Sequence, residues 1–202
     1  DLLTLRMEKL MDLGLYKDTA ALYKKVSEDP YHERLARAGM RALFHSGQAS
    51  AACLDVKIIN GQFDQNPSFW EKLSVVCDYI MAPEDDRDKN KIKIEDSELL
   101  QKIVKKDKFD FTPKAPADFE NLSALEKAVL FGTGRIDYEK FEPGDPADMA
   151  PALLGMFLYD DNLPQDIKLT FLVHAVNLGL RPINDLTEFY KKSDLPGLPA
   201  LY

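Results

Sequence analysis

"LMDLGLYKDTAALYKKVSEDP", residues 10–30, is the stretch that decides the fold, because it encodes one complete helical hairpin. Apolar residues at helical spacing lead into it from Leu2. Gly14 then ends the first helix, since glycine enters the left-handed region of a C-terminal cap without strain. A second helix is expected over about 17–27, and it ends before Pro30, which pushes the preceding residue out of the helical region.

The same hairpin recurs further along the chain. Gly47 follows Gly14 at an offset of 33 residues. The same offset pairs residues of similar character, namely Met7 with Met40, Leu10 with Leu43, Met11 with Phe44, and Ala20 with Cys53. Paired helices with a period of about 33–34 residues are typical of α-solenoids, in which each hairpin buries its apolar face against the next one.

The first unit has the order Leu–Gly–Tyr, then Ala, then an aromatic residue, then Pro. This order resembles that of the tetratricopeptide repeat family. The resemblance covers residues 1–82 at most, since the second unit lacks the Tyr and the final Pro, and Trp70 is out of register. It implies stacked helical hairpins that expose a groove built from one helix of each pair.

We divide the chain into three segments. Residues 1–82 form the hairpins. Residues 83–122 begin with a charged linker and continue as a short helix and an extended, proline-containing segment. Residues 123–202 return to helices, which we expect to pack on the first segment or to continue it as one domain. The extended segment carries two prolines and three phenylalanines whose rings are expected to dock on the core: Pro113, Pro116, Phe109, Phe111 and Phe119.

Cap signals mark several helix ends. The expected N-caps are Ser68, with Glu71 three residues on, and Ser123, with Glu126. Another helix is expected to start at Pro164 and to end at Gly179, following the usual asymmetry of these two residues. No segment alternates over strand length, although the five residues "KIKIE" leave a short strand open as the less favoured alternative. The sequence therefore predicts an all-α protein of about nine helices.

Composition excludes several function classes. With 202 residues and 45% hydrophobic content, the chain can bury a sizeable core. A net charge of −8 and a pI near 5.0 argue against nucleic-acid binding, which needs a broad basic surface. No apolar run approaches the ~18 residues of a membrane span, so no transmembrane segment is expected. The chain starts at Asp1, which fits a fragment boundary or a removed leader, and the compartment, cytoplasm or periplasm, stays open.

Catalytic motifs are absent from the sequence. There is no G-x-S-x-G elbow, and "GTGRID", which begins at Gly132, lacks the strand and the Lys of a phosphate loop, so we interpret it as a helix-ending turn. The runs Glu84–Asp86 and Asp160–Asp161 lie in polar turns, where a carboxyl group is not desolvated enough for acid–base catalysis. The protein is therefore expected not to be an enzyme, and to hold no cofactor and no metal.

The histidines and cysteines have structural explanations. His32 is expected to be solvated or to cap the helix that follows it. His45, at a helix end, is expected to be partly protonated, because that form suits the helix dipole. His174, on an apolar helix, is expected to be a hydrogen-bonded core residue. Cys53 and Cys77 lie among apolar residues and are expected to be buried free thiols, with one disulfide between them as the alternative.

One surface pattern suggests a binding site. Arg34, Arg37 and Arg41 follow i, i+3, i+7 spacing and so share one helix face, a local basic strip in an acidic protein. They are candidates for docking an acidic peptide or a carboxylate terminus, because arginine binds carboxylates in a bidentate way. The competing interpretation is an ordinary solvated face whose charge is balanced by the nearby acids Glu28, Asp29 and Glu33. Trp70 is expected to belong to the core.

The favoured function is a non-enzymatic protein–protein interaction module, such as a scaffold, an adaptor or an assembly factor. Its partner is expected to be another protein or a peptide, and self-association stays open. One alternative is the non-catalytic superhelical part of a larger enzyme, such as a cell-wall-acting one. Another is a structural subunit of an envelope or secretion assembly.

Overall fold

The computed structural model describes residues 1–26, 32–59, 61–63, 65–82, 94, 97–105 and 110–192. Its helices are α1 (Leu2–Asp12), α2 (Tyr16–Lys24), α3 (Glu33–His45), α4 (Ala49–Ile59), α5 (Pro67–Met81), α6 (Glu98–Lys105), α7 (Ala124–Thr133), α8 (Pro151–Tyr159), α9 (Gln165–Asn177) and α10 (Ile183–Lys192). Within these ranges, 3₁₀ turns cover Pro116–Phe119 and Pro146–Asp148. The predicted all-α class is confirmed, with ten α-helices in the described ranges where about nine were expected.

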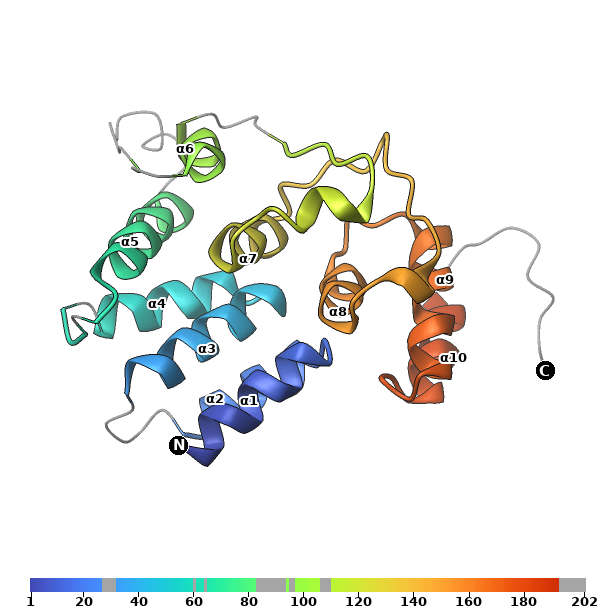
Figure 1. Ribbon diagram of the computed structural model, residues 1–202, viewed down its shortest axis with the longest axis horizontal. Coiled ribbons are helices and arrows are strands. Elements are labelled where there is room, and N and C mark those ends of the chain that lie inside the picture. The colour runs from blue at the N-terminus through green and yellow to red at the C-terminus, as the bar shows by residue number, and fades with distance from the viewer. Residues whose placement is uncertain are drawn as a thin grey trace.

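The first five helices stack in chain order (Figure 1). Helix α3 packs on α1, α2 and α4, and α5 packs on α4. The helices therefore form successive hairpins, as the 33-residue offset predicts. Residues that the offset pairs are buried in both units, at Met7 and Met40 and at Met11 and Phe44.

The hairpin turns share one cap geometry. At Gly14 the glycine N–H donates to the carbonyl of Met11, and the next N–H donates to the carbonyl of Leu10, both at 2.9 Å. This is a Schellman cap, which satisfies the last carbonyls of the helix. Gly47 and Gly179 make the same pair of bonds, and all three glycines have φ between 71° and 75°. The cap glycines predicted at these positions are confirmed.

The second half of the chain packs directly on the first. Helix α7 lies against α3, and α8 reaches the turn between α1 and α2 (Figure 1). Both contacts are made at glycines. A Cβ on Gly132 would lie 2.6 Å from the Phe44 ring, and a Cβ on Gly155 would lie 2.4 Å from the Gly14 backbone. The close approach of these helices therefore depends on the absence of a side chain at two positions.

Aromatic rings fill the space between α7, α8 and α9. Phe119 is fully buried, and its ring lies 5.2–5.4 Å from those of Phe111, Phe131 and Phe157. The docking expected of Phe111 and Phe119 is confirmed, whereas Phe109 lies outside the described residues. Phe111 also forms an isolated parallel β-bridge with Ile136, which was not expected. The extended segment is thus held by both its backbone and its rings.

The predicted helix ends are correct in most cases. The capping box is confirmed, with the Ser123 hydroxyl accepting from the Glu126 N–H at 3.2 Å and the Glu126 carboxylate accepting from the Ser123 N–H at 2.8 Å. Gly134, with φ +64°, ends α7, so the turn interpretation of "GTGRID" is confirmed. The N-cap predicted at Ser68 is wrong, because α5 already begins at Pro67, whose fixed φ suits the first helical position.

The expectation of free thiols is also wrong. Cys53 on α4 and Cys77 on α5 form a disulfide, and both residues are at most 1% exposed. Their Cα atoms lie 5.0 Å apart because α4 and α5 pack along each other. The charged linker predicted after residue 82 and most of "KIKIE" lie outside the described residues. Within the ranges described above, no helix has the length and apolarity that a membrane span requires.

Candidate functional site

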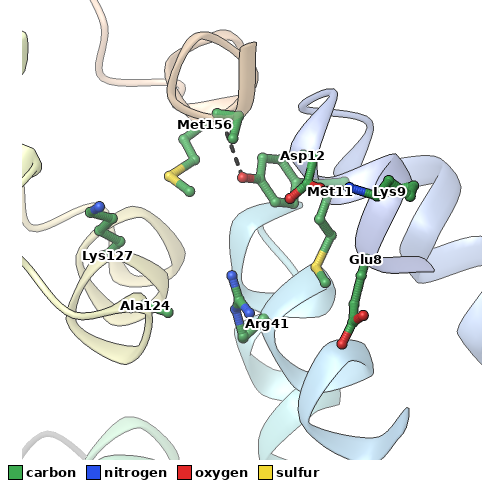
Figure 2. Close-up of a pocket in the computed structure, with 10 residues that line it drawn as sticks. Glu8, Lys9, Met11, Asp12, Arg41, Ala124, Lys127 and Met156 are labelled. Atoms are coloured by element: carbon green, nitrogen blue, oxygen red, sulfur yellow. Dashed lines mark hydrogen bonds and ion pairs between the residues drawn. The ribbon is translucent and has the colours of Figure 1, made fainter. Parts of the chain in front are cut away.

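A cleft of about 400 Å³ opens where α1, α3, α7 and α8 meet (Figure 2). It is lined by Glu8, Lys9, Met11, Asp12, Tyr16, Arg41, Ala124, Lys127, Ala152 and Met156. One wall comes from the first hairpins and the other from α7 and α8, so the cleft requires both halves of the chain. We call it the basic cleft, for the charges described next.

Arg41 projects from α3 into the space between α1 and α7 (Figure 2). Its Nε atom is buried and has no hydrogen-bond partner among the described residues. Most buried polar groups in proteins do have a partner. No acidic side chain in the described part of the chain lies within ion-pair distance of Arg41. Arg41 therefore keeps its hydrogen-bonding capacity for a group that enters the cleft.

Lys127 supplies a second positive charge from the opposite wall, on α7. The acids that share the cleft are occupied by other cations. Asp12 lies 2.9 Å from Lys9 Nζ, and Glu8 is bound by Arg34 at 2.6 Å. The charges that remain without a counter-ion in the described cleft are those of Arg41 and Lys127, so this surface favours an anionic group.

His45 is buried close enough to Arg41 and Lys127 to be affected by both positive charges. It is 1% exposed, and burial lowers its pKa to about 3, assisted by the positive charges of Arg41 and Lys127. The expectation that His45 is partly protonated is therefore wrong, because desolvation outweighs the helix dipole. His32 is exposed, as expected, and its Nε2 lies 3.1 Å from Asp1. His174 is half-buried and not a core residue.

Tyr16 is a lining residue of the cleft that also joins its two walls. Its hydroxyl donates to the carbonyl of Ala152 at 3.1 Å, which ties α2 to α8. Burial raises the pKa of the Tyr16 hydroxyl well above its ordinary value, and the charge of Arg41 opposes that rise only in part. The hydroxyl therefore stays protonated and acts as a structural donor between the two walls.

The predicted arginine strip lies on one face of α3, as its spacing implies. All three side chains line a smaller neighbouring cleft of about 210 Å³, together with Glu8 and Ala38. Their surroundings differ, however. Arg34 makes a bidentate ion pair with Glu8, at 2.8 and 2.6 Å, and the Arg37 guanidinium lies 4.8 Å from the centre of the Phe69 ring. Arg41 alone of the three reaches the basic cleft.

The acids that were expected to balance the charge of this strip are not the ones that pair with it in the described structure. Glu33 is 3% exposed and accepts a hydrogen bond from Trp70 Nε1 at 3.1 Å, and it forms no ion pair with an arginine among the described residues. Trp70 is buried, as predicted. Glu28 and Asp29 lie outside the described residues. The sequence interpretation missed Glu8 as the partner of Arg34, and it missed Lys127, which no local pattern connects to Arg41.

A second cleft, of about 390 Å³, adjoins the basic cleft. The two clefts share the lining residues Lys127, Ala152 and Met156. Neither cleft contains a metal-ligand set, since no group of three or more His, Cys, Asp or Glu side chains in the described ranges could hold a metal ion. The two clefts therefore adjoin along α8, and we call the pair the α8 groove.

Residues 1–56 match the model of a protein family described as "Bacterial transcriptional activator domain". The match spans α1 to α3 and most of α4, just over a quarter of the chain. No curated protein and no solved structure matches the chain. The chain is thus similar to this family over residues 1–56. The similarity supports a helical domain there, but it does not identify a tetratricopeptide repeat.

Proposed function

We propose that the protein is a non-enzymatic protein–protein interaction module that binds an acidic segment of another protein in the basic cleft. The observation that carries this proposal is the placement of Arg41 and Lys127 on opposite walls, with no counter-ion for either in the described part of the cleft. Two cations facing one concave space suit a carboxylate better than a neutral group. The stacked hairpins supply the rigid walls that such a site requires.

The family match suggests a setting for this module. Residues 1–56 are similar to a domain of bacterial transcriptional activators, so a link to gene regulation is part of the proposal. The match weighs against the expectation that the protein is unconnected with nucleic acid. A net charge of −8 nevertheless disfavours direct contact with DNA phosphates. We therefore assign the chain a contact with protein rather than with DNA itself.

The test compares two double variants of equal charge change. Arg41→Ala/Lys127→Ala removes the cations of the cleft. Arg6→Ala/Lys57→Ala removes one exposed arginine and one exposed lysine that line neither cleft. The protein that co-purifies with the wild-type chain from its source organism is identified, purified and titrated against each variant by calorimetry.

We expect the cleft variant to bind this partner at least about tenfold more weakly than the wild type does, and the control variant to bind like the wild type. Equal affinities for the wild type and the cleft variant, with both folded by circular dichroism, would overturn the assignment of the cleft. Catalytic turnover by the isolated chain of any compound that it binds would overturn the non-enzymatic part of the proposal.

A further inference from the structure

The groove along α8 changes character between its two clefts. The basic cleft carries Arg41, and Lys127 stands at the junction. The second cleft is built largely of apolar and prolyl side chains, of which Met149 and Met156 are at least 91% buried and Leu153 is partly buried. An occupant that extends beyond the basic cleft therefore moves from cationic walls onto an apolar floor.

The lining of the second cleft also carries negative charge. Glu120, Asp145 and Asp148 line this cleft, and all three are exposed. Asp145 caps the adjacent 3₁₀ turn by accepting from the Ala147 N–H at 2.9 Å. Glu120 and Asp148 have no cation within ion-pair distance in the described part of the chain. Apart from Lys127, which the clefts share, the unpaired charges are positive in the basic cleft and negative in the second cleft.

We propose that the groove binds an extended peptide segment whose acidic, large apolar and basic side chains follow one another in that order. This inference rests on the proposed function and specifies the chemistry of the partner. The acidic side chain meets Arg41 and Lys127, the apolar side chain enters beside Met149 and Met156, and the basic side chain reaches Glu120 and Asp148. A uniformly acidic segment fits the first cleft and is repelled by the acids of the second.

The three side chains of the ligand need to point towards the same wall of the groove. The clefts share the lining residues Ala152 and Met156, which lie one helical turn apart, about 6 Å along the axis. An extended peptide advances about 3.3 Å per residue, and alternate side chains point to the same face. Acidic, apolar and basic side chains placed two positions apart therefore share one face of an extended peptide.

The experiment titrates the full ¹⁵N-labelled chain with blocked nine-residue peptides and follows backbone amide shifts by NMR. The probe carries Asp, Leu and Lys at its third, fifth and seventh positions, with Gly and Ser elsewhere. Two control peptides replace its Lys by Glu or its Leu by Ala. Matched protein variants are Glu120→Gln/Asp148→Asn in the second cleft and Glu139→Gln/Asp18→Asn, two exposed acids that line neither cleft.

We expect the Asp–Leu–Lys probe to bind about five- to tenfold more tightly than either control peptide. The shifts should include Lys127 and Met156, and the advantage of Lys over Glu should vanish in Glu120→Gln/Asp148→Asn but persist in Glu139→Gln/Asp18→Asn. Equal affinities for the three peptides would overturn it, as would an absence of binding. Neither result contradicts the proposed function. That proposal fails separately if Arg41→Ala/Lys127→Ala binds the partner protein as tightly as the wild type does.

Discussion

The backbone of Gly14, in the turn between α1 and α2, packs directly against the backbone of Gly155 in α8. A Cβ on Gly155 would lie 2.4 Å from both the Cα and the carbonyl oxygen of Gly14, and a Cβ on Gly14 would lie 2.4 Å from the carbonyl oxygen of Pro151. No side chain fits at such distances without displacing a helix. Together with the bond from Tyr16 to Ala152, two lining residues of the basic cleft, this contact joins the first hairpin to α8.

Gly14→Ala is therefore expected to destabilise the protein more than Gly47→Ala does. The two glycines have nearly equal φ, 72° and 75°, so alanine has the same left-handed strain at both, about 1 kcal/mol. Nothing lies within 4 Å of a Cβ at Gly47, whereas a Cβ at Gly14 meets α8. Overpacking adds about 1–3 kcal/mol at Gly14. Urea unfolding of both variants measures the difference in the free energy of unfolding. Equal losses would show that α8 can shift to accommodate the new side chain at no cost.

His45 is expected to make the protein less stable in acid. Its pKa is about 3 in the folded protein, below the ordinary value of 6.5, because the ring is buried beside Arg41 and Lys127. The unfolded chain therefore binds a proton that the folded protein does not, and stability falls as the pH drops from about 6.5 towards 3. The loss approaches about 1.4 kcal/mol per pH unit within this window.

The measurement compares urea unfolding at pH 7.5 and pH 5.5. His45→Leu should lose less stability between these values than the wild type, by about 1.3 kcal/mol. Both ring nitrogens of His45 are buried without a partner in the described structure, so leucine leaves no new polar group unsatisfied. His32→Leu is the matched control, since it removes an imidazole from an exposed position. An unchanged pH dependence in His45→Leu would contradict the assignment.

Local chain chemistry was sufficient to predict the hairpins. Gly14, Gly47 and Gly179 each end a helix in a Schellman cap, and Ser123 forms its capping box with Glu126. These features depend on residues within a few positions of one another. The 33-residue offset was also readable, because it compares the chain with itself. Such signals need no knowledge of how distant helices cross.

The basic cleft and the disulfide were not predictable in the same way. Arg41 could be placed on a helix face, but its companion Lys127 lies on α7, and only the packing of α7 on α3 brings the two to one cleft. The pairing of Cys53 with Cys77 likewise depends on the crossing of α4 and α5. The protonation of His45 was not predictable from its place at a helix end, because its ring is packed against Tyr16 and Phe131, which belong to other helices.

Reduction of the disulfide is expected to lower stability by about 3 kcal/mol, since the bond between Cys53 and Cys77 closes a loop with a sequence separation of 24. Urea unfolding with and without dithiothreitol should show a lower midpoint in the reductant. Cys53→Ala/Cys77→Ala is the control, and its midpoint should not respond to dithiothreitol. A wild-type midpoint that is the same in both buffers would mean that the cross-link contributes nothing to stability.

Trp70 is expected to stabilise the protein through its indole N–H as well as through its ring. Trp70 Nε1 donates to Glu33 at 3.1 Å, and the second carboxyl oxygen of Glu33 is buried without a partner among the described residues. Trp70→Phe keeps ring contacts with Phe63 and Phe69 but leaves the buried carboxyl group without this donor. The expected cost is about 1–3 kcal/mol in the free energy of unfolding, measured by circular dichroism in urea.

The double variant Trp70→Phe/Glu33→Leu separates the hydrogen bond from packing. When both partners become apolar, no polar group is left unsatisfied, so the double variant should lose less stability than the two single variants added together. A coupling of about 1 kcal/mol or more is expected, because both residues are buried and in direct contact. If the stability losses of the two single variants simply add, water hydrates Glu33 when the indole is removed. The hydrogen bond between Glu33 and Trp70 would then not stabilise the packing of α3 on α5.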